Sequence, residues 1–162
     1  MIPRNEISGE IKEKILVAGD DEIETILLCE YLRQEKYEVS GPYSYNEVKA
    51  HFFDQEYAFL FACIENSEQL AVFSRLPSIC PSTVFISIVE REKMLLGFDS
   101  LVYGFDIFIM KPIKLGILGE IMSRARLIHF NNQKSGIISA LKQSIRNLKL
   151  RLDNELGKHK DE

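Results

Sequence analysis

The sequence predicts one doubly wound α/β domain with a five-stranded parallel sheet and a C-terminal helical extension. Short apolar segments alternate with segments of helical periodicity five times between residues 14 and 128. This order is typical of a parallel sheet covered by helices on both faces. The chain has 162 residues, 46% hydrophobic and 27% charged, which fits one globular domain plus an appendage. We expect a lead-in over residues 1–13, the α/β domain over 14–130 and a helix over 131–162.

Five short apolar runs provide the expected strands. YAFLFACI contains no charged residue and has the composition of a central strand that is buried on both faces. The second run, EVSG, is expected to end at Gly41 and Pro42, because both residues favour turns. The runs cover residues 14–19, 38–41, 57–64, 82–89 and 105–110.

Segments with helical spacing of apolar residues follow the strands. The first carries Ile23, Leu27 and Leu28 on one face and acidic residues in its first turn, where the helix dipole favours them. Pro77 is expected to end the third helix, and Gly97 to interrupt a weaker fourth helix. The expected helices cover residues 20–37, 45–55, 65–76, 91–104 and 113–128.

The composition also excludes several classes of protein. No apolar run reaches the roughly 18 residues that a membrane helix needs, and the first 14 residues lack the apolar core of a signal peptide. Cys29, Cys63 and Cys80 are widely spaced without a C-x-x-C pair, which argues against a disulfide framework or zinc site and favours the reducing cytoplasm. We find no nucleophile–base pair and no glycine-rich cofactor loop, so we expect no enzymatic activity.

Polar residues lie near the carboxyl ends of the expected strands. In a sheet of this kind the functional crevice lies beyond those ends. The candidate functional residues are therefore Asp20, Asp21, Cys63, Glu65, Ser87 and Lys111.

The ordered set of segments resembles the receiver domain of response regulators, a CheY-like, flavodoxin-like fold. ILVAGDDE resembles the first strand and its acid pair, and FISI resembles the fourth strand, which ends at Ser87. GFDIFIMKP resembles the fifth strand, with Phe108 at the switch aromatic position and Lys111 followed by Pro112. YEVSGPYSYNEV resembles the second strand and the turn after it. The resemblance covers about residues 14–128 and implies strand order 2-1-3-4-5.

The resemblance also implies a site. In receiver domains the acid pair and an Asp at the end of the central strand hold magnesium, that Asp accepts a phosphoryl group, and a Ser/Thr and a Lys contact the group. Magnesium requires oxygen ligands, and phosphoryl transfer requires the cation and suitably placed donors. The resemblance implies that Asp20 and Asp21 form a remnant acidic pocket and that Ser87 and Lys111 are phosphoryl-contact equivalents.

The sequence departs from the family at the phosphoacceptor. Aligning the apolar run places Cys63 there, 42 residues after Asp21, and a two-residue shift would place Glu65 there. A thiol is a poor magnesium ligand and cannot become an acyl phosphate, whereas Glu65 would be a fixed negative charge. Only 24 residues separate Cys63 from Ser87, so the loop that offers the metal a backbone carbonyl is missing. We interpret Cys63 as an inert core thiol.

The leading hypothesis is an atypical receiver, or pseudo-receiver, that acts as a phosphorylation-independent interaction module in signal transduction. Its expected partner is a signalling protein or output module, bound by the surface of residues 91–104, 105–110 and the helix after Pro112. Lys111 is expected to pair with Asp20 or Asp21. No cofactor is expected, apart from weak Mg²⁺ at the acid pair if binding survives. The alternatives are a two-component receiver phosphorylated at an unusual or shifted acceptor, and a basic-tailed nucleic-acid-binding regulator.

The tail carries a separate pattern. Residues 1–130 have a net charge of −7 and residues 131–162 one of +3. After a polar break at 131–136, apolar residues recur at spacings of 3, 4, 3 and 4, the spacing of a coiled-coil seam. We expect this helix to form a homodimer; a helix folded back on the domain and a connector to an output module stay open. The seam consists of Ile138, Leu141, Ile145, Leu148 and Leu152.

Overall fold

The computed structural model describes residues 12–20 and 22–159, without the side chains of 134–139, 158 and 159. The strands are β1 (Lys14–Ala18), β2 (Glu38–Tyr43), β3 (Phe59–Cys63), β4 (Val84–Val89) and β5 (Ile107–Met110). They form one parallel sheet in the order β2-β1-β3-β4-β5. The predicted fold class and strand order are confirmed.

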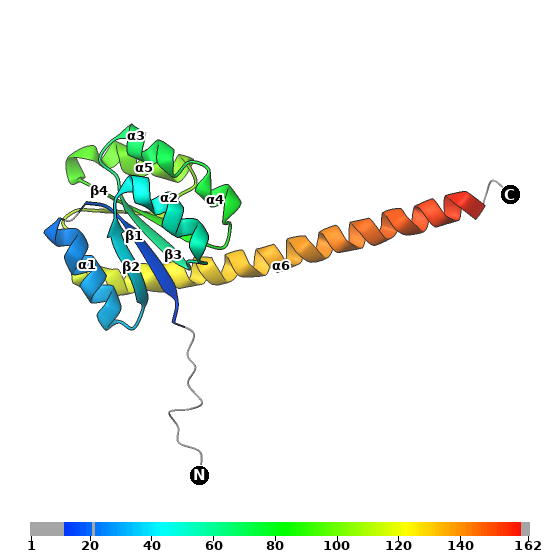
Figure 1. Cartoon of the computed structure of the whole chain (residues 1–162), viewed down its shortest axis with the longest axis horizontal. Coiled ribbons are helices and arrows are strands. Elements are labelled where there is room, and N and C mark those ends of the chain that lie inside the picture. Colours follow the sequence, from blue (N-terminus) through cyan, green and yellow to red (C-terminus); the bar gives the residue numbers. More distant parts are fainter. Residues whose placement is uncertain (1–11, 21, 160–162) are drawn as a thin grey trace, which may run out of the picture.

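Helices cover both faces of this sheet (Figure 1). They are α1 (Ile23–Gln34), α2 (Tyr45–Asp54), α3 (Ser67–Val72), α4 (Leu76–Ile79), α5 (Met94–Val102) and α6 (Leu115–His159). Figure 1 shows α1 and the first part of α6 on one face and α2 to α5 on the other. Two apolar layers result, one on each side of the sheet.

The central strand β3 contributes to both layers. Its five residues are all buried, and neighbouring strands pair with it on both sides. Phe59 and Phe61 lie in the layer beneath α1 and α6, whereas Leu60 and Ala62 lie in the layer beneath α2 to α5. An uncharged strand is required here because neither face contacts water.

The predicted ends of one strand and one helix are wrong. Strand β2 continues through Gly41 and Pro42 to Tyr43, and its register with β1 shifts at this point. Gly41 has a φ of +120°, and a Cβ there would lie 2.4 Å from the Val17 carbonyl oxygen, so only glycine lets the strand pass so close to β1. Pro77 lies in the first turn of α4, a position where proline is tolerated, and does not end a helix.

The apolar face of α1 also differs from the prediction. Leu28 is buried as expected, together with Thr25 and Cys29, but Ile23 and Leu27 are exposed. The helix therefore packs Leu28 and Leu32 against the sheet and leaves three large apolar side chains outside, since Ile26 is exposed as well.

Helix α5 leaves even more of its large apolar side chains exposed. Gly97 does not interrupt it, and a Cβ at this position would lie 2.5 Å from the Phe108 ring. Gly97 and Ser100 are its buried residues. The large apolar side chains project outward at helical spacing, and they are Met94, Leu95, Phe98, Leu101 and Val102.

Helix α6 has 45 residues and runs without a break through 131–136, so the predicted polar break is wrong. Its first part is anchored by Leu118, Met122 and Ala125, which are buried against the sheet. Arg126 donates a hydrogen bond to the Tyr37 hydroxyl. Beyond this anchor the helix leaves the domain and projects as a rod (Figure 1), and the whole helix is about 66 Å long at 1.5 Å per residue.

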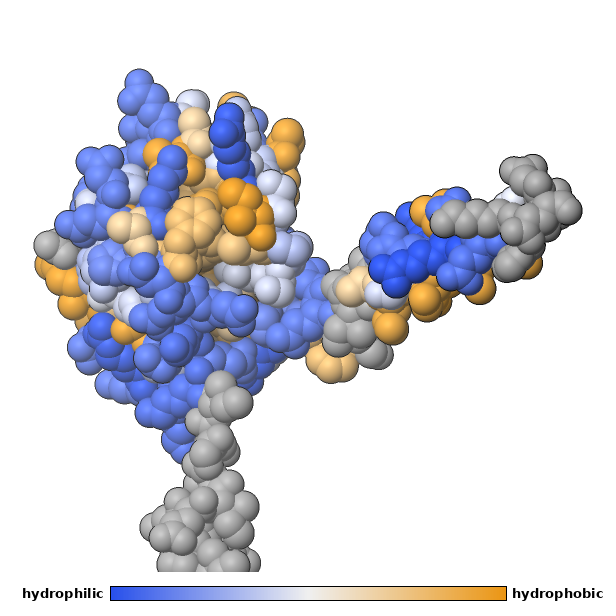
Figure 2. Space-filling view, turned by 45° about the vertical axis from the view of Figure 1, so that its right-hand side comes forward, coloured by the Kyte–Doolittle hydropathy of each residue, from blue (hydrophilic) through white to orange (hydrophobic). Residues whose placement is uncertain are grey.

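The projecting part of α6 leaves its apolar residues uncovered, so the folded-back alternative is wrong. Leu141, Ile145, Leu148 and Leu152 are 58–64% exposed. Apolar side chains gather on one side of the rod and hydrophilic ones on the other (Figure 2). Among the described residues, no helix has both the length and the apolar character to cross a membrane.

We expect Gly97→Ala to lower the free energy of unfolding by about 1–3 kcal/mol, because the added methyl group overlaps the Phe108 ring. Gly119→Ala in α6 is the matched control, since a Cβ there meets no atom within 4 Å. The control should raise stability by about 0.5–1 kcal/mol. Urea denaturation followed by circular dichroism measures both changes, and equal effects would contradict the close packing of α5.

Candidate functional site

The candidate site lies at the carboxyl edge of the sheet, on the face covered by α1 and α6. Side chains alternate between faces along a strand, and Cys63 lies in this layer with Val17 and Ile88. Cys63 is the register partner of Ile88 on β4. Gly19 continues the alternation of β1 and lies against Cys63, and Lys111 follows the last residue of β5.

Gly19 takes the place beside Cys63 where an acidic side chain was expected. A Cβ at Gly19 would lie 3.3 Å from Cys63 Sγ and 3.4 Å from Thr25 Cγ2. Asp20, the next residue, is exposed. Asp21 lies outside the described residues. The strand thus brings a glycine, not an acidic residue, against Cys63.

Cys63 is buried, with 6% of its surface exposed. Its Sγ lies 3.9 Å from Thr25 Oγ1, the sole side-chain hydrogen bond that the structure gives it. Burial raises the pKa of the Cys63 thiol, and the nearby positive charge of Lys111 lowers it by less. The group is a protonated thiol at neutral pH, with neither the charge nor the oxygen atoms of a metal ligand.

Lys111 pairs with Glu22, and the expected pair with Asp20 or Asp21 is not found at Asp20. Lys111 Nζ donates to Glu22 Oε2 at 3.0 Å. Burial lowers the pKa of Lys111, but the hydrogen bond to Glu22 and nearby acidic groups outweigh it and raise the pKa overall. The Lys111 ammonium group therefore already has an acidic partner, and the ion pair helps to hold the start of α1 against β5.

Ser87 lies on the other face of the sheet, so its expected position beside the phosphoacceptor is wrong. It is opposite Ala62 in β3, whereas Cys63 is opposite Ile88. The Ser87 and Ser100 hydroxyl oxygens lie 2.7 Å apart, and Ser100 donates to the Gly97 carbonyl at 2.6 Å. The position on the Cys63 face thus belongs to Ile88, which has no hydrogen-bonding side chain.

Phe108 shares the face of Ser87. Its half-buried ring packs in a T-shaped arrangement on Phe98, with ring centroids 5.1 Å apart. Gly97 lies against the other part of the ring. The aromatic residue expected at the switch position is therefore enclosed by α5.

The segment after β3 is short, as the residue count predicts. Three residues separate Cys63 from α3, and Asn66 caps that helix by accepting from the Gln69 N–H at 2.9 Å. The Glu65 N–H donates to Gln69 Oε1 at 2.7 Å, and the Glu65 carbonyl accepts from Lys93 Nζ at 3.0 Å. A backbone carbonyl of this loop therefore already accepts a hydrogen bond from an ammonium group.

Sequence reasoning missed Gly19, Glu22, Thr25 and Ile88. A usable signal was the alternation along β1, which places Gly19 rather than Asp20 on the face of Val17 and Cys63. Within the part of the chain that the structure describes, no three His, Cys, Asp or Glu residues cluster in a way that could hold a metal ion.

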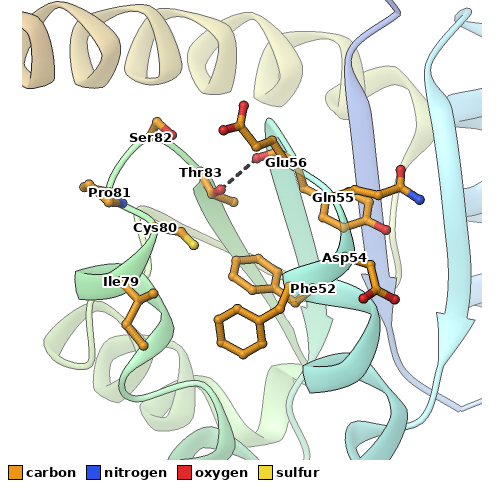
Figure 3. A pocket seen from close by; sticks show the side chains of 11 residues that line it. Phe52, Asp54, Gln55, Glu56, Ile79, Cys80, Pro81, Ser82 and Thr83 are labelled. Atoms are coloured by element: carbon orange, nitrogen blue, oxygen red, sulfur yellow. Dashed lines mark hydrogen bonds between the residues drawn. The ribbon is translucent and has the colours of Figure 1, made fainter.

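A separate hollow lies at the amino edge of the sheet, far along the strands from Cys63. It has a volume of about 400 Å³ and lies between the end of α2 and the segment that follows α4 (Figure 3). Phe52 and Ile79 line it on the apolar side, and Asp54 and Glu56 lie at its polar side. Thr83 Oγ1 donates a hydrogen bond to the Tyr57 carbonyl at 2.7 Å, so this hydroxyl proton already has an acceptor within the domain.

No protein-family model matches the sequence, and no curated protein matches it. Solved structures do. NtrX from Brucella abortus in complex with ADP is 22% identical with a TM-score of 0.68, over 81% of this chain and 29% of that one. The NtrX receiver domain from Brucella abortus is 22% identical with a TM-score of 0.63, over 68% and 96%. The receiver domain of the TMAO respiratory response regulator TorR is 21% identical with a TM-score of 0.62, over 74% and 98%.

These comparisons and the sheet order define the class of fold. The chain has the CheY-like receiver fold of two-component response regulators, followed by a long C-terminal helix. It spans less than a third of the length of the first NtrX chain. Receiver domains are signalling modules.

We expect Cys80 to react with Ellman's reagent in the native protein at pH 8 about tenfold or more faster than Cys63, because buried groups react only after local opening. Cys80 is half-buried, whereas Cys29 and Cys63 are buried, and burial raises the pKa of the Cys29 thiol to about 11. Cys80→Ser should abolish the fast phase, and Cys63→Ser should leave it intact. A fast phase that disappears with Cys63→Ser would show an accessible, reactive thiol at the site.

Proposed function

We propose that this protein is a receiver-like interaction module whose activity does not depend on phosphorylation. The observation that carries the proposal is the replacement of reactive groups on one face of the carboxyl edge: Gly19, Cys63 and Ile88 lie where a receiver requires an acid, a nucleophilic carboxylate and a hydroxyl. Lys111 is held by Glu22 and a loop carbonyl by Lys93. Both lysines are thereby engaged within the chain, which supports a carboxyl edge that binds no phosphoryl group.

The contacts between the other face of the sheet and α5 support a single conformation of this helix. Ser87 of β4 is linked through Ser100 to the Gly97 carbonyl within α5. Phe108 fits against Gly97, which leaves no room for a side chain there. Helix α5 is thereby held on the sheet without a phosphoryl group to position it, which is what a constitutive module requires.

The contact surface for a signalling partner or output module is formed by α5, β5 and the start of α6. Leu95 and Val102 of α5 are 75% and 85% exposed, and Met110 and Ile117 extend the apolar surface across β5 to α6. A hollow of about 260 Å³ lies between β5 and α6. Large exposed apolar patches on a soluble domain mark interaction sites.

The projecting part of α6 forms a homodimer through its apolar seam. Leu141, Ile145, Leu148 and Leu152 are exposed along one side of the rod, and none of the described residues covers them. Burying a leucine-sized side chain is worth about 1.5–3 kcal/mol, so a pair of such seams can stabilise a dimer.

We expect the protein to bind no beryllofluoride in the presence of magnesium, and to take no phosphate from acetyl phosphate. The reason is the absence of a carboxylate at Cys63 and Gly19. Isothermal titration calorimetry and intact-mass measurement test the two statements. An ordinary receiver domain, measured in the same buffer, is the positive control, and saturable binding by this chain would overturn the proposal.

Cys63→Asp alone should not restore magnesium binding with the affinity of an ordinary receiver. The variant still has Gly19 in place of an acid, and Lys93 still occupies the Glu65 carbonyl. Magnesium demands near-octahedral oxygen ligands, and one added carboxylate does not supply them. Calorimetric titration with MgCl₂ gives the affinity, and strong binding by this single variant would show that the neighbouring contacts are not decisive.

We expect the double variant Leu141→Lys, Leu148→Lys to be a monomer at micromolar concentration with a folded domain. Each change removes about 1.5–3 kcal/mol of apolar burial and adds like charges across the seam. Leu150→Lys is the matched control, because Leu150 is 62% exposed but lies off the seam, while the two seam leucines are each 58% exposed. Light scattering gives the mass, and loss of the dimer in the control as well would argue against this seam.

A further inference from the structure

We propose that two copies of α6 pair in parallel and in register, along a seam that extends from Leu152 back to Leu127 at the edge of the domain. This inference rests on the homodimer of the proposed function and adds the direction of the helices and a longer contact. It therefore places both domains at the same end of a central two-helix stem.

The residue types along the seam favour this arrangement. With Ile145 and Leu152 at heptad position a, Leu141 and Leu148 fall at position d, and the sequence places Ile138 at the preceding a. The side chain of Ile138 is not among those described. β-Branched residues at a with leucine at d favour two parallel strands.

The same heptad register continues toward the domain. It places Lys134 at d, Asn131 at a and Leu127 at d, within one unbroken helix. Asn131 is exposed, and Leu127 is 62% exposed. A single Asn at an a position specifies register and oligomeric state. Two Asn131 side chains meet across the seam when the helices are parallel and in register, whereas an antiparallel pair would place them at opposite ends of the seam.

The domain leaves this side of α6 free. Leu118 and Ala125 face the sheet. At 3.6 residues per turn, Leu127 projects about 180° away from Leu118. A second helix can therefore lie along the outer side of α6 without displacing the helix from its own sheet.

Charge selects the parallel direction. Lys142 and Lys149 fall at e, and Ser144 and Arg151 at g. In a parallel pair each g residue meets the e residue of the following heptad, which gives Ser144 with Lys149 and Arg151 with Leu156. These pairs contain no like charges. An antiparallel pair sets e against e, so that Lys142 of one copy faces Lys149 of the other twice, and such e and g contacts determine orientation.

Disulfide cross-linking of the full-length chain tests the direction. Leu141→Cys places a thiol at a d position away from the middle of the seam, so that two such thiols meet in the parallel pair and lie about 14 Å apart along the axis in the antiparallel one. Gln143→Cys places one at the outer f position as matched control. With copper-phenanthroline as catalyst, two thiols form one disulfide and pass two electrons and two protons to dissolved oxygen. We expect most of Leu141→Cys to migrate as a covalent dimer on a non-reducing gel, and Gln143→Cys to remain at the background that the unmodified chain shows through its native cysteines.

A second variant examines the role of Asn131. Asn131→Ile should raise the melting temperature and yield species larger than a dimer, because it removes the polar residue that sets the register and adds a further apolar a position. Analytical ultracentrifugation gives the distribution of masses. An unchanged melting temperature and a strict dimer would contradict the extension of the seam to Leu127.

Each outcome separates the direction from the dimer itself. A chain that is dimeric by light scattering but does not cross-link at Leu141→Cys overturns the parallel arrangement and leaves the homodimer standing. Equal cross-linking at Leu141→Cys and Gln143→Cys shows random collision and also overturns it. A monomeric chain overturns both the direction and the dimer, while the beryllofluoride experiment still decides the loss of phosphoryl transfer independently.

Discussion

The rest of the structure depends on the double burial of the central strand β3. Strands pair with it on both sides and helices cover both of its faces, so each of its residues has to be uncharged up to Cys63. At its carboxyl end this apolar environment continues, because Gly19 lets β1 approach Cys63 closely and Ile88 lies alongside. The packing that stabilises the domain thus extends into the place where other proteins of this fold keep their charged site.

Large apolar side chains are exposed on two helices. Helix α5 turns its glycine and serine inward and its large apolar side chains outward, and α6 carries exposed leucines and isoleucines far beyond the sheet. Apolar side chains that could contact a partner are on the outside, while Lys111 at the crevice is paired with Glu22. This distribution of apolar and charged groups supports the proposed interaction module.

The regular alternation of apolar runs and helical segments was enough to predict a parallel sheet covered by helices, and the resemblance to receiver domains implied the strand order that the structure shows. The positions of single side chains were harder, because a shift of one residue along a strand moves a side chain to the other face. Ser87 was placed beside Cys63 for this reason, although the register assigns that place to Ile88. The polar segment 131–136 predicts a break, but polar residues and one glycine are compatible with the continuous helix that the structure shows there. Glu22 was missed because only its distance to Lys111 in the folded chain gives it a role.

The unbroken course of α6 has a mechanical consequence. A helix transmits rotation along its axis as well as translation, and no hinge interrupts this one between its seat on the sheet and His159. About 44 Å of it projects beyond residue 130 at 1.5 Å per residue, so a tilt of about 5° at the seat swings the far end by about 4 Å. The rod is in this sense a lever arm, which converts a small displacement at the domain into a larger one at a distance.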